Sequence, residues 1–182
     1  MSKAQALTAH TRKRSGSGAL TSLRREGLIP AVVYGKAQPS FNVRLNRKEV
    51  ENILHHSAAE QILVNLTIED TNQTLLALIQ AVQHNPLTDT ITHLDFHAIR
   101  EDEVIHANIP LELTGESAGV KAGGLLEHLI HTLEIKCLPK DLPEVIHADV
   151  SGLELNGSLH IREIAFPEGV KPVANGEIIV AM

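Results

Sequence analysis

Two histidines and an aspartate at alternate positions form the group of side chains best suited to chemistry in this sequence. In the run His93-Leu94-Asp95-Phe96-His97, an extended backbone directs the three polar side chains to one face and the two apolar ones to the other. Two imidazoles and a carboxylate can hold Zn²⁺ and leave a position open for water, as in a metal-dependent hydrolase.

The spacing of His93, Asp95 and His97 argues against that metal site. At about 3.3 Å per residue, the three side chains spread over roughly 13 Å of strand, so one ion reaches at most two of them unaided. No other stretch supplies an evident third ligand. Three interpretations stay open: a metal site, a polar strand face, and a face that contacts nucleic acid.

Motifs for nucleotide-dependent catalysis are incomplete. Gly16-Ser17-Gly18 lacks the preceding strand and the third glycine of a dinucleotide-binding fingerprint. The glycine-rich segment Gly115–Gly124 lacks the G-K-[ST] ending of a phosphate-binding loop. We therefore expect a protein that is not an enzyme and that needs no cofactor.

Positive charge is concentrated at the start of the chain. Residues 1–50 hold ten Lys/Arg against two acids, a net +8, whereas residues 101–182 hold five against fourteen, a net −9. The densest cluster comprises Lys3, Arg12, Lys13, Arg14, Arg24, Arg25 and Lys36. Lys and Arg bind polyanions by displacing counterions from phosphates, which favours a nucleic-acid surface, although a solvated loop is the alternative. We expect the acidic part to have a different task.

The scarcity of aromatic residues selects among modes of RNA binding. The chain has one Tyr, three Phe and no Trp, and strand alternation assigns Phe41 and Phe96 to a core. Base-stacking modules need several exposed rings, so a folded or duplex RNA, gripped by its backbone and read in its shallow groove, is the better fit. The side chains suited to such reading are Gln80, Gln83, His93 and Asp95. Gln80 and Gln83 lie on opposite faces of a regular strand, so a bulge or a strand end must separate them.

Apolar residues that recur at every second position predict a mainly β protein with a few short helices. Strands are expected over 4–10, 30–35, 41–46, 62–68, 75–82, 91–99, 105–113, 145–150 and 178–181. One short helix is expected over 19–26, with Ser17 as N-cap and Gly27 as terminator, and another from Asn46 to about Ser57. Residues 125–138 fit a helix in their first part and a strand in their later part. The acidic joint at 100–103 predicts two domains, residues 1–98 and 99–182.

The remaining features of the composition indicate a soluble protein of a reducing compartment. Cys137 is the single cysteine, so no disulfide can form within the chain. The first ten residues are too polar for a secretory leader, and no run of about 18 apolar residues exists. We expect a cytoplasmic protein that does not contact membranes.

Four ordered motifs resemble one known family. They are G-x-G-A-x-x-x-L-R-R-E-G-x-I-P-A-V-V-Y-G (Gly16–Gly35), A-V-Q-x-x-P-x-x-x-x-I-x-H-L-D-F (Ala81–Phe96), G-E-S-A-G-V-K-A-G-G (Gly115–Gly124) and C-L-P-x-D-L-P-E (Cys137–Glu144). Together they look like the bacterial large-subunit ribosomal protein family L twenty-five, in its two-domain CTC or general-stress form. The resemblance implies an N-terminal β-barrel-like domain bound to loop E of 5S rRNA from the minor-groove side. It also implies a β-rich C-terminal domain, for which we expect neighbouring ribosomal proteins as partners.

The resemblance also implies roles for individual residues. Arg12, Lys13 and Arg24 would bind phosphates, and Tyr34 would support or touch the RNA backbone. The groove, with its ordered water or Mg²⁺, would be met by Gln80, Gln83, His93 and Asp95. The sequence departs from the usual family pattern at Ser17, Thr21, Ser22, His84 and Asn85. Several of these positions usually carry cations, so we expect fewer phosphate contacts here.

Overall fold

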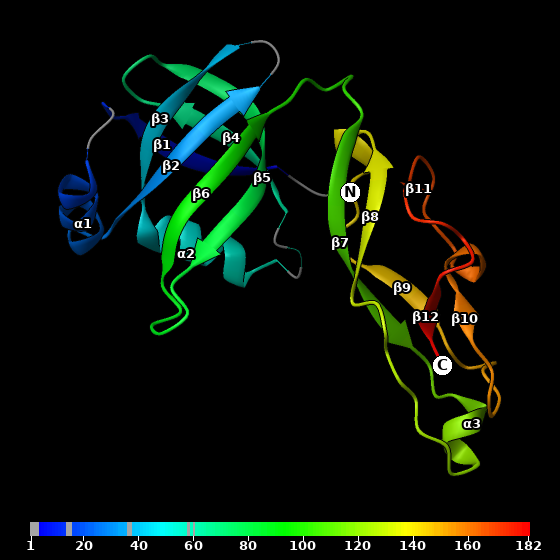
Figure 1. The fold of residues 1–182 in the computed structure, drawn as a ribbon. Helices are drawn as coiled ribbons and strands as arrows, with labels where there is room; N and C mark the ends of the chain where they lie inside the picture. The colour runs from blue at the N-terminus through cyan, green and yellow to red at the C-terminus, as the bar shows by residue number, and fades with distance from the viewer. Residues whose placement is uncertain (1–3, 14–15, 36–37, 58, 60) are drawn as a thin grey trace. The chain divides into compact units, whose positions relative to one another are not determined.

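The computed structural model of the chain describes residues 4–13, 16–35, 38–57, 59 and 61–182. The chain divides into two compact units, residues 2–103 and residues 104–182. Both are built mainly from β-strands, with few and short helices (Figure 1). The predicted fold class is therefore confirmed. Lys3, Arg14 and Lys36, which the sequence places in the basic cluster, lie outside the described residues.

The first unit is a closed six-stranded barrel. Its strands are β1 (Gln5–Thr11), β2 (Leu28–Gly35), β3 (Gln38–Asn46), β4 (Leu63–Ile68), β5 (Gln73–His84) and β6 (Ile91–Ala98). Their order around the barrel is β1-β3-β2-β6-β5-β4, and a parallel pairing of β4 with β1 closes the ring. The last strand, β6, therefore lies between β2 and β5, parallel to the first and antiparallel to the second (Figure 1).

The barrel interior takes one side of every strand, because successive side chains point to opposite faces. Ile29, Leu45, Leu66, Leu94 and Phe96 have almost no exposed surface and meet in one core. The alternation seen in the sequence thus follows from the closure of the sheet. Phe41 is partly buried against this core.

Two helices accompany the barrel: α1 (Ser17–Arg25), beside β2, and α2 (Arg47–His55), which packs Val50 and Ile53 into the core. The side chain of Asn46 caps α2 by accepting the N–H of Lys48 at 3.0 Å. The predicted N-cap of α1 is wrong, because extended Gly16 holds the cap position and Ser17 is already helical. The predicted terminator is confirmed: Gly27 follows α1 with φ +78°, a conformation that favours glycine.

The second unit contains a four-stranded sheet and a small two-stranded one. Its elements are β7 (Ile105–Thr114), α3 (Ala118–Lys121), β8 (Thr132–Cys137), β9 (Ile146–Asp149), β10 (Leu159–His160), β11 (Lys171–Pro172) and β12 (Ile179–Ala181), with 3₁₀ turns at Pro139–Asp141 and Ile161–Glu163. The order in the larger sheet is β11-β8-β7-β9, and β10 pairs with β12 in the smaller one.

The segment before β8 is extended, not helical. The N–H of Glu127 donates to the Met182 carbonyl at 2.8 Å, and the N–H of Met182 donates back to the Glu127 carbonyl at 3.1 Å. His128 forms an isolated bridge with Ala181. Pairing with the last strand therefore decides between the two interpretations that the apolar pattern left open. Among the described residues, no helix is long and apolar enough to cross a membrane.

Candidate nucleic-acid interface

The polar side of β6 faces outward from the barrel, as its alternation predicts. Leu94 and Phe96 are fully buried in the core, whereas His93, Asp95 and His97 lie on the opposite face and are partly exposed. The strand thus supplies a row of three polar side chains on a rigid wall. What they can do depends on the strands at either side.

The register with β2 and β5 assembles a patch around this row. Tyr34 lies opposite His97, with ring centroids 5.6 Å apart and the planes tilted by 30°. Gln83 lies opposite His93 on the other side. Because directly paired residues of adjacent strands share a face, Tyr34, Gln83, His93, Asp95 and His97 form one polar surface, which we name the β2-β6-β5 patch.

A β-bulge adds Gln80 to the same surface. Ile79 pairs with Phe96 and Ala81 with Asp95, so Gln80 is an extra residue in the ladder. Ile79 and Val82 both pack on the core although they lie three positions apart, which leaves Gln80 on the outer side together with Gln83. Of the two alternatives that the sequence left open, a bulge or a strand end, the structure has the bulge. The carbonyl of Gln80 also accepts the Gln61 amide at 3.0 Å, which fixes the bulge.

Asp95 is the electrostatic centre of the patch. One of its oxygens lies 2.8 Å from Nδ1 of His93, outside hydrogen-bond alignment, so the contact is an ion pair only when the imidazole is protonated. Burial, and then the negative charge of Asp95, raise the pKa of Tyr34. The phenol therefore keeps its proton at neutral pH and can donate a hydrogen bond.

Two arginines lie at the edge of the patch, each anchored to backbone. Arg24 of α1 donates from Nε to the Thr92 carbonyl at 3.1 Å, which ties the helix to the start of β6. Arg12, just after β1, donates to the Val43 carbonyl at 3.1 Å and to the Asn42 amide oxygen at 3.3 Å. Both guanidinium groups keep unbonded N–H groups in these contacts, because a guanidinium carries five donors.

The two arginines are close enough to repel each other. Burial, and then the positive charge of Arg24, lower the pKa of Arg12, yet a guanidinium remains charged in proteins. Lys13 is exposed one residue further on. Holding two positive charges close together costs free energy in the free protein, and an anion that binds between them offsets that cost.

The structure places the predicted residues Tyr34, Gln80, Gln83, His93 and Asp95 on one patch with Arg12 and Arg24 beside it, and it adds His97 and Asn42. Asn42 was not predicted, although the alternation that turns Val43 and Leu45 inward places it outward. Its contact with Arg12 depends on the β1-β3 register, which no local pattern reveals. The metal interpretation of His93, Asp95 and His97 gains no support from this geometry: among the residues that the structure describes, no group of three or more His, Cys, Asp or Glu could hold an ion.

Comparison with known proteins identifies both units. The model of the ribosomal L25p family matches residues 7–96, and a model described as the C-terminal domain of ribosomal protein TL5 matches residues 104–182. A protein named large ribosomal subunit protein bL25 from Akkermansia muciniphila is 43% identical over 182 residues, which cover 100% of this chain and 89% of that relative. Proteins of the same name from Carboxydothermus hydrogenoformans and Geobacter sulfurreducens are 37% and 32% identical, over 97% and 91% of this chain and 87% and 86% of theirs. The chain therefore belongs to the ribosomal L25p family, in a two-domain form that carries the TL5 C-terminal domain.

Proposed function

We propose that the barrel unit binds 5S rRNA through the β2-β6-β5 patch and the arginines at its edge, and that this contact holds the chain in the large ribosomal subunit. Family membership makes the chain a structural ribosomal protein and not an enzyme. It therefore removes the hydrolase interpretation of His93, Asp95 and His97. A role in general stress stays a prediction.

The observation that carries the proposal is the placement of Arg12 and Arg24. Both side chains are fixed by backbone carbonyls beside the patch, and they repel each other in the free protein. A phosphate between them relieves that repulsion and releases counterions. Lys13, the residue after Arg12, is exposed and adds a third positive charge. Phosphate contacts of this kind set the orientation of a protein on RNA without reading its sequence.

The patch supplies the groups that distinguish one RNA from another. Tyr34 and the two glutamines can donate hydrogen bonds, and Asp95 accepts them, so the surface presents both kinds of group to a shallow groove. Bases in an internal loop of non-standard pairs expose donors and acceptors that a regular duplex hides. A surface with few exposed rings and mixed polar groups suits that target better than an unpaired strand.

Binding to 5S rRNA at several salt concentrations tests the proposal. With Arg12, Lys13 and Arg24 on phosphates, the logarithm of the affinity should fall with the logarithm of salt at a slope of about −2 to −3 or steeper. An unrelated duplex of the same length should bind much more weakly at the same salt. A hydroxyl-radical footprint locates the site on the RNA. Equal affinity for both RNAs, or a slope near zero, contradicts the proposal.

A further inference from the structure

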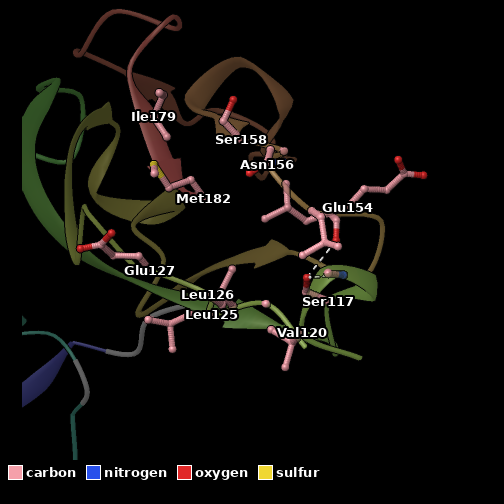
Figure 2. Close-up of a pocket in the computed structure, with 15 residues that line it drawn as sticks. Ser117, Val120, Leu125, Leu126, Glu127, Glu154, Asn156, Ser158, Ile179 and Met182 are labelled. Atoms are coloured by element: carbon pink, nitrogen blue, oxygen red, sulfur yellow. Dashed lines mark hydrogen bonds between the residues drawn. The ribbon is translucent and has the colours of Figure 1, made fainter. Parts of the chain in front are cut away.

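The second unit contains a preformed cavity that the RNA proposal does not use. It has a volume of about 580 Å³ and lies between α3, the segment 124–127, the loop 153–158 and the end of β12 (Figure 2). This volume is in the range of pockets that hold a small ligand or a few side chains. All of the lining residues belong to the second unit.

Backbone contacts hold the cavity walls in place. Ser117 donates from Oγ to the Leu153 carbonyl at 2.8 Å and accepts the N–H of Gly119 at 3.2 Å, which ties α3 to the loop (Figure 2). Ser117 lies in a G-x-S-x-G sequence, but this burial and these bonds make it a helix cap and not a nucleophile. A Cβ on Gly119 would lie 3.1 Å from the backbone of Glu154 and Leu155. The glycine-rich motif thus permits close packing of the wall.

Several of the apolar side chains that line the cavity are exposed. Leu125 exposes 91% of its surface, Leu155 54%, Met182 52% and Val120 39%. Four large apolar side chains from separate segments around one cavity are unusual on a protein surface without a partner. Since the walls are fixed, the cavity can bind without first ordering itself, which lowers the entropic cost of association.

The charge around the cavity selects the kind of partner. Glu127 and Glu154 line it, no Lys or Arg does, and neither carboxylate has a hydrogen-bonding or ionic side-chain partner within the described part of the chain. Residues 104–182 carry eleven Asp/Glu against five Lys/Arg. RNA and anionic membranes are repelled by this surface, and a second copy of this acidic unit would be repelled as well.

We propose that this cavity binds a cationic segment of another protein, inserting a Leu, Ile or Met side chain among Leu125, Leu155 and Met182. Lysine or arginine neighbours of that side chain pair with Glu127 and Glu154. A buried apolar anchor with charged pairs at the rim is the usual arrangement of a protein interface. The proposal does not rest on the RNA site, which lies in the other unit.

A defined probe tests the cavity in the full chain. The probe is a fluorescein-labelled nine-residue peptide in which Lys alternates with Leu and Ile, and its binding is read by fluorescence polarisation. One control peptide replaces Leu and Ile with Ser, and another replaces Lys with Glu. We expect the probe to bind and both controls to bind at least tenfold more weakly. If the Ser-containing peptide binds as tightly as the probe, attraction between charges alone explains binding and the proposal is overturned.

Matched variants locate the binding site on the chain. Leu125→Ser and the double variant Glu127→Gln, Glu154→Gln should each weaken probe binding by about three- to tenfold. Val173→Ser replaces an exposed aliphatic residue outside the cavity, and the double variant Glu144→Gln, Glu168→Gln removes two carboxylates outside it. Each should change probe binding by less than about twofold. Equal losses in both sets overturn the proposal. Binding of 5S rRNA should be the same in all four variants, so a failure here is separable from a failure of the RNA proposal.

Cross-linking in ribosomes identifies the occupant. A photoreactive benzoylphenylalanine at position 125 should link to a protein segment rich in Lys or Arg with an aliphatic residue, whereas the same group at position 173 should not link there. Cross-links to rRNA alone overturn the proposal, as do cross-links to a second copy of this chain accompanied by a dimer in sedimentation.

Discussion

Nδ1 of His93 lies 2.8 Å from an oxygen of Asp95, two positions along the same strand and on the face of the barrel turned away from the core. Asp95 also raises the pKa of Tyr34 on the neighbouring strand β2. One carboxylate therefore acts on two side chains that we assign to RNA, and its replacement has consequences that can be measured separately.

Asp95→Asn should lower the pKa of Tyr34. Burial is the larger cause of the raised pKa and persists in the variant, so the value should fall without reaching the ordinary value of about 10. Tyr34 is the single tyrosine and the chain has no tryptophan, so absorbance at high pH reports this phenol directly. An unchanged titration curve would show that the two side chains do not interact.

The same substitution should reduce discrimination between RNAs. A neutral amide in place of Asp95 loses a strong acceptor for base amino groups and also removes repulsion from phosphates. We expect affinity for 5S rRNA to fall by about three- to thirtyfold, whereas affinity for an unrelated duplex stays the same or rises. Parallel binding curves at one salt concentration give the ratio. A uniform loss on both RNAs would instead indicate a damaged fold.

Arg24→Ala should weaken 5S rRNA binding by about tenfold and reduce the magnitude of the salt slope by about 1, because one phosphate contact is lost. Arg25→Ala is the matched control. It removes the same charge from the next position of α1, where the side chain is exposed, and it should have less than about a threefold effect. Similar losses in both variants would mean that net charge, and not the placement of Arg24, governs binding.

Gly35→Ala should destabilise the barrel by about 1–3 kcal/mol. A Cβ at Gly35 would lie 2.5 Å from the backbone carbonyl oxygen of Ala98, which forces β2 and β6 apart beside Tyr34. Gly18→Ala is the opposite case, because a Cβ at Gly18 meets nothing within 4 Å and the residue lies in a helix. It should be neutral or stabilise by up to about 1 kcal/mol. Urea denaturation measures both, and a neutral result at Gly35 would contradict the close approach of the two strands.

Thr11→Val should raise the pKa of Asp70 and weaken the acid dependence of stability. The Thr11 hydroxyl donates to Asp70 at 2.6 Å and the Thr11 N–H at 2.5 Å. These bonds lower the pKa of Asp70, the side-chain bond being the larger cause. The lowered pKa stabilises the fold above the unfolded value of about 3.9, and that contribution is lost as pH falls through the folded pKa.

Carboxyl ¹³C titration measures Asp70 directly. In Thr11→Val the N–H bond remains, so the pKa should rise only part of the way to its ordinary value. Asp70→Asn should remove this part of the acid dependence altogether. Acid unfolding curves that coincide with the wild type for both variants would contradict the assignment. Thr11 immediately precedes Arg12, so the same contact holds the end of β1 that leads into the residues to which we assign phosphate contacts.

The sequence predicts which side of β6 faces outward because parity along one strand is a local property. It also predicts that Gln80 and Gln83 need a bulge or a strand end between them to share a face, and the ladder contains a bulge. It does not predict that Tyr34 meets His97. That contact depends on β6 pairing with β2, more than fifty residues earlier in the chain, and no pattern within either strand specifies the partner.

The cavity in the second unit is a further feature that the sequence does not predict, because its walls come from segments far apart in the chain. The motif Gly115–Gly124 is visible in the sequence, and its glycines and Ser117 suggest only a loop. Their role depends on the loop 153–158 and on the end of β12, which pack against α3. The apolar spacing of residues 125–138 fits a helix in the first part and a strand in the later part, and the pairing of residues 127–130 with the last strand shows that the first part is extended as well.

β6 is the last strand of the barrel to be synthesised, and it pairs between β2 and β5, which both precede it in the chain. While a ribosome is still producing residues 91–98, β2 and β5 have unpaired edges and the row formed by His93, Asp95 and His97 does not yet exist. Pairing over such long sequence separations makes folding slow relative to helical proteins. A nascent chain therefore lacks part of the surface that we assign to RNA until β6 has been made and has paired, so that RNA binding, as we propose it, requires a finished barrel.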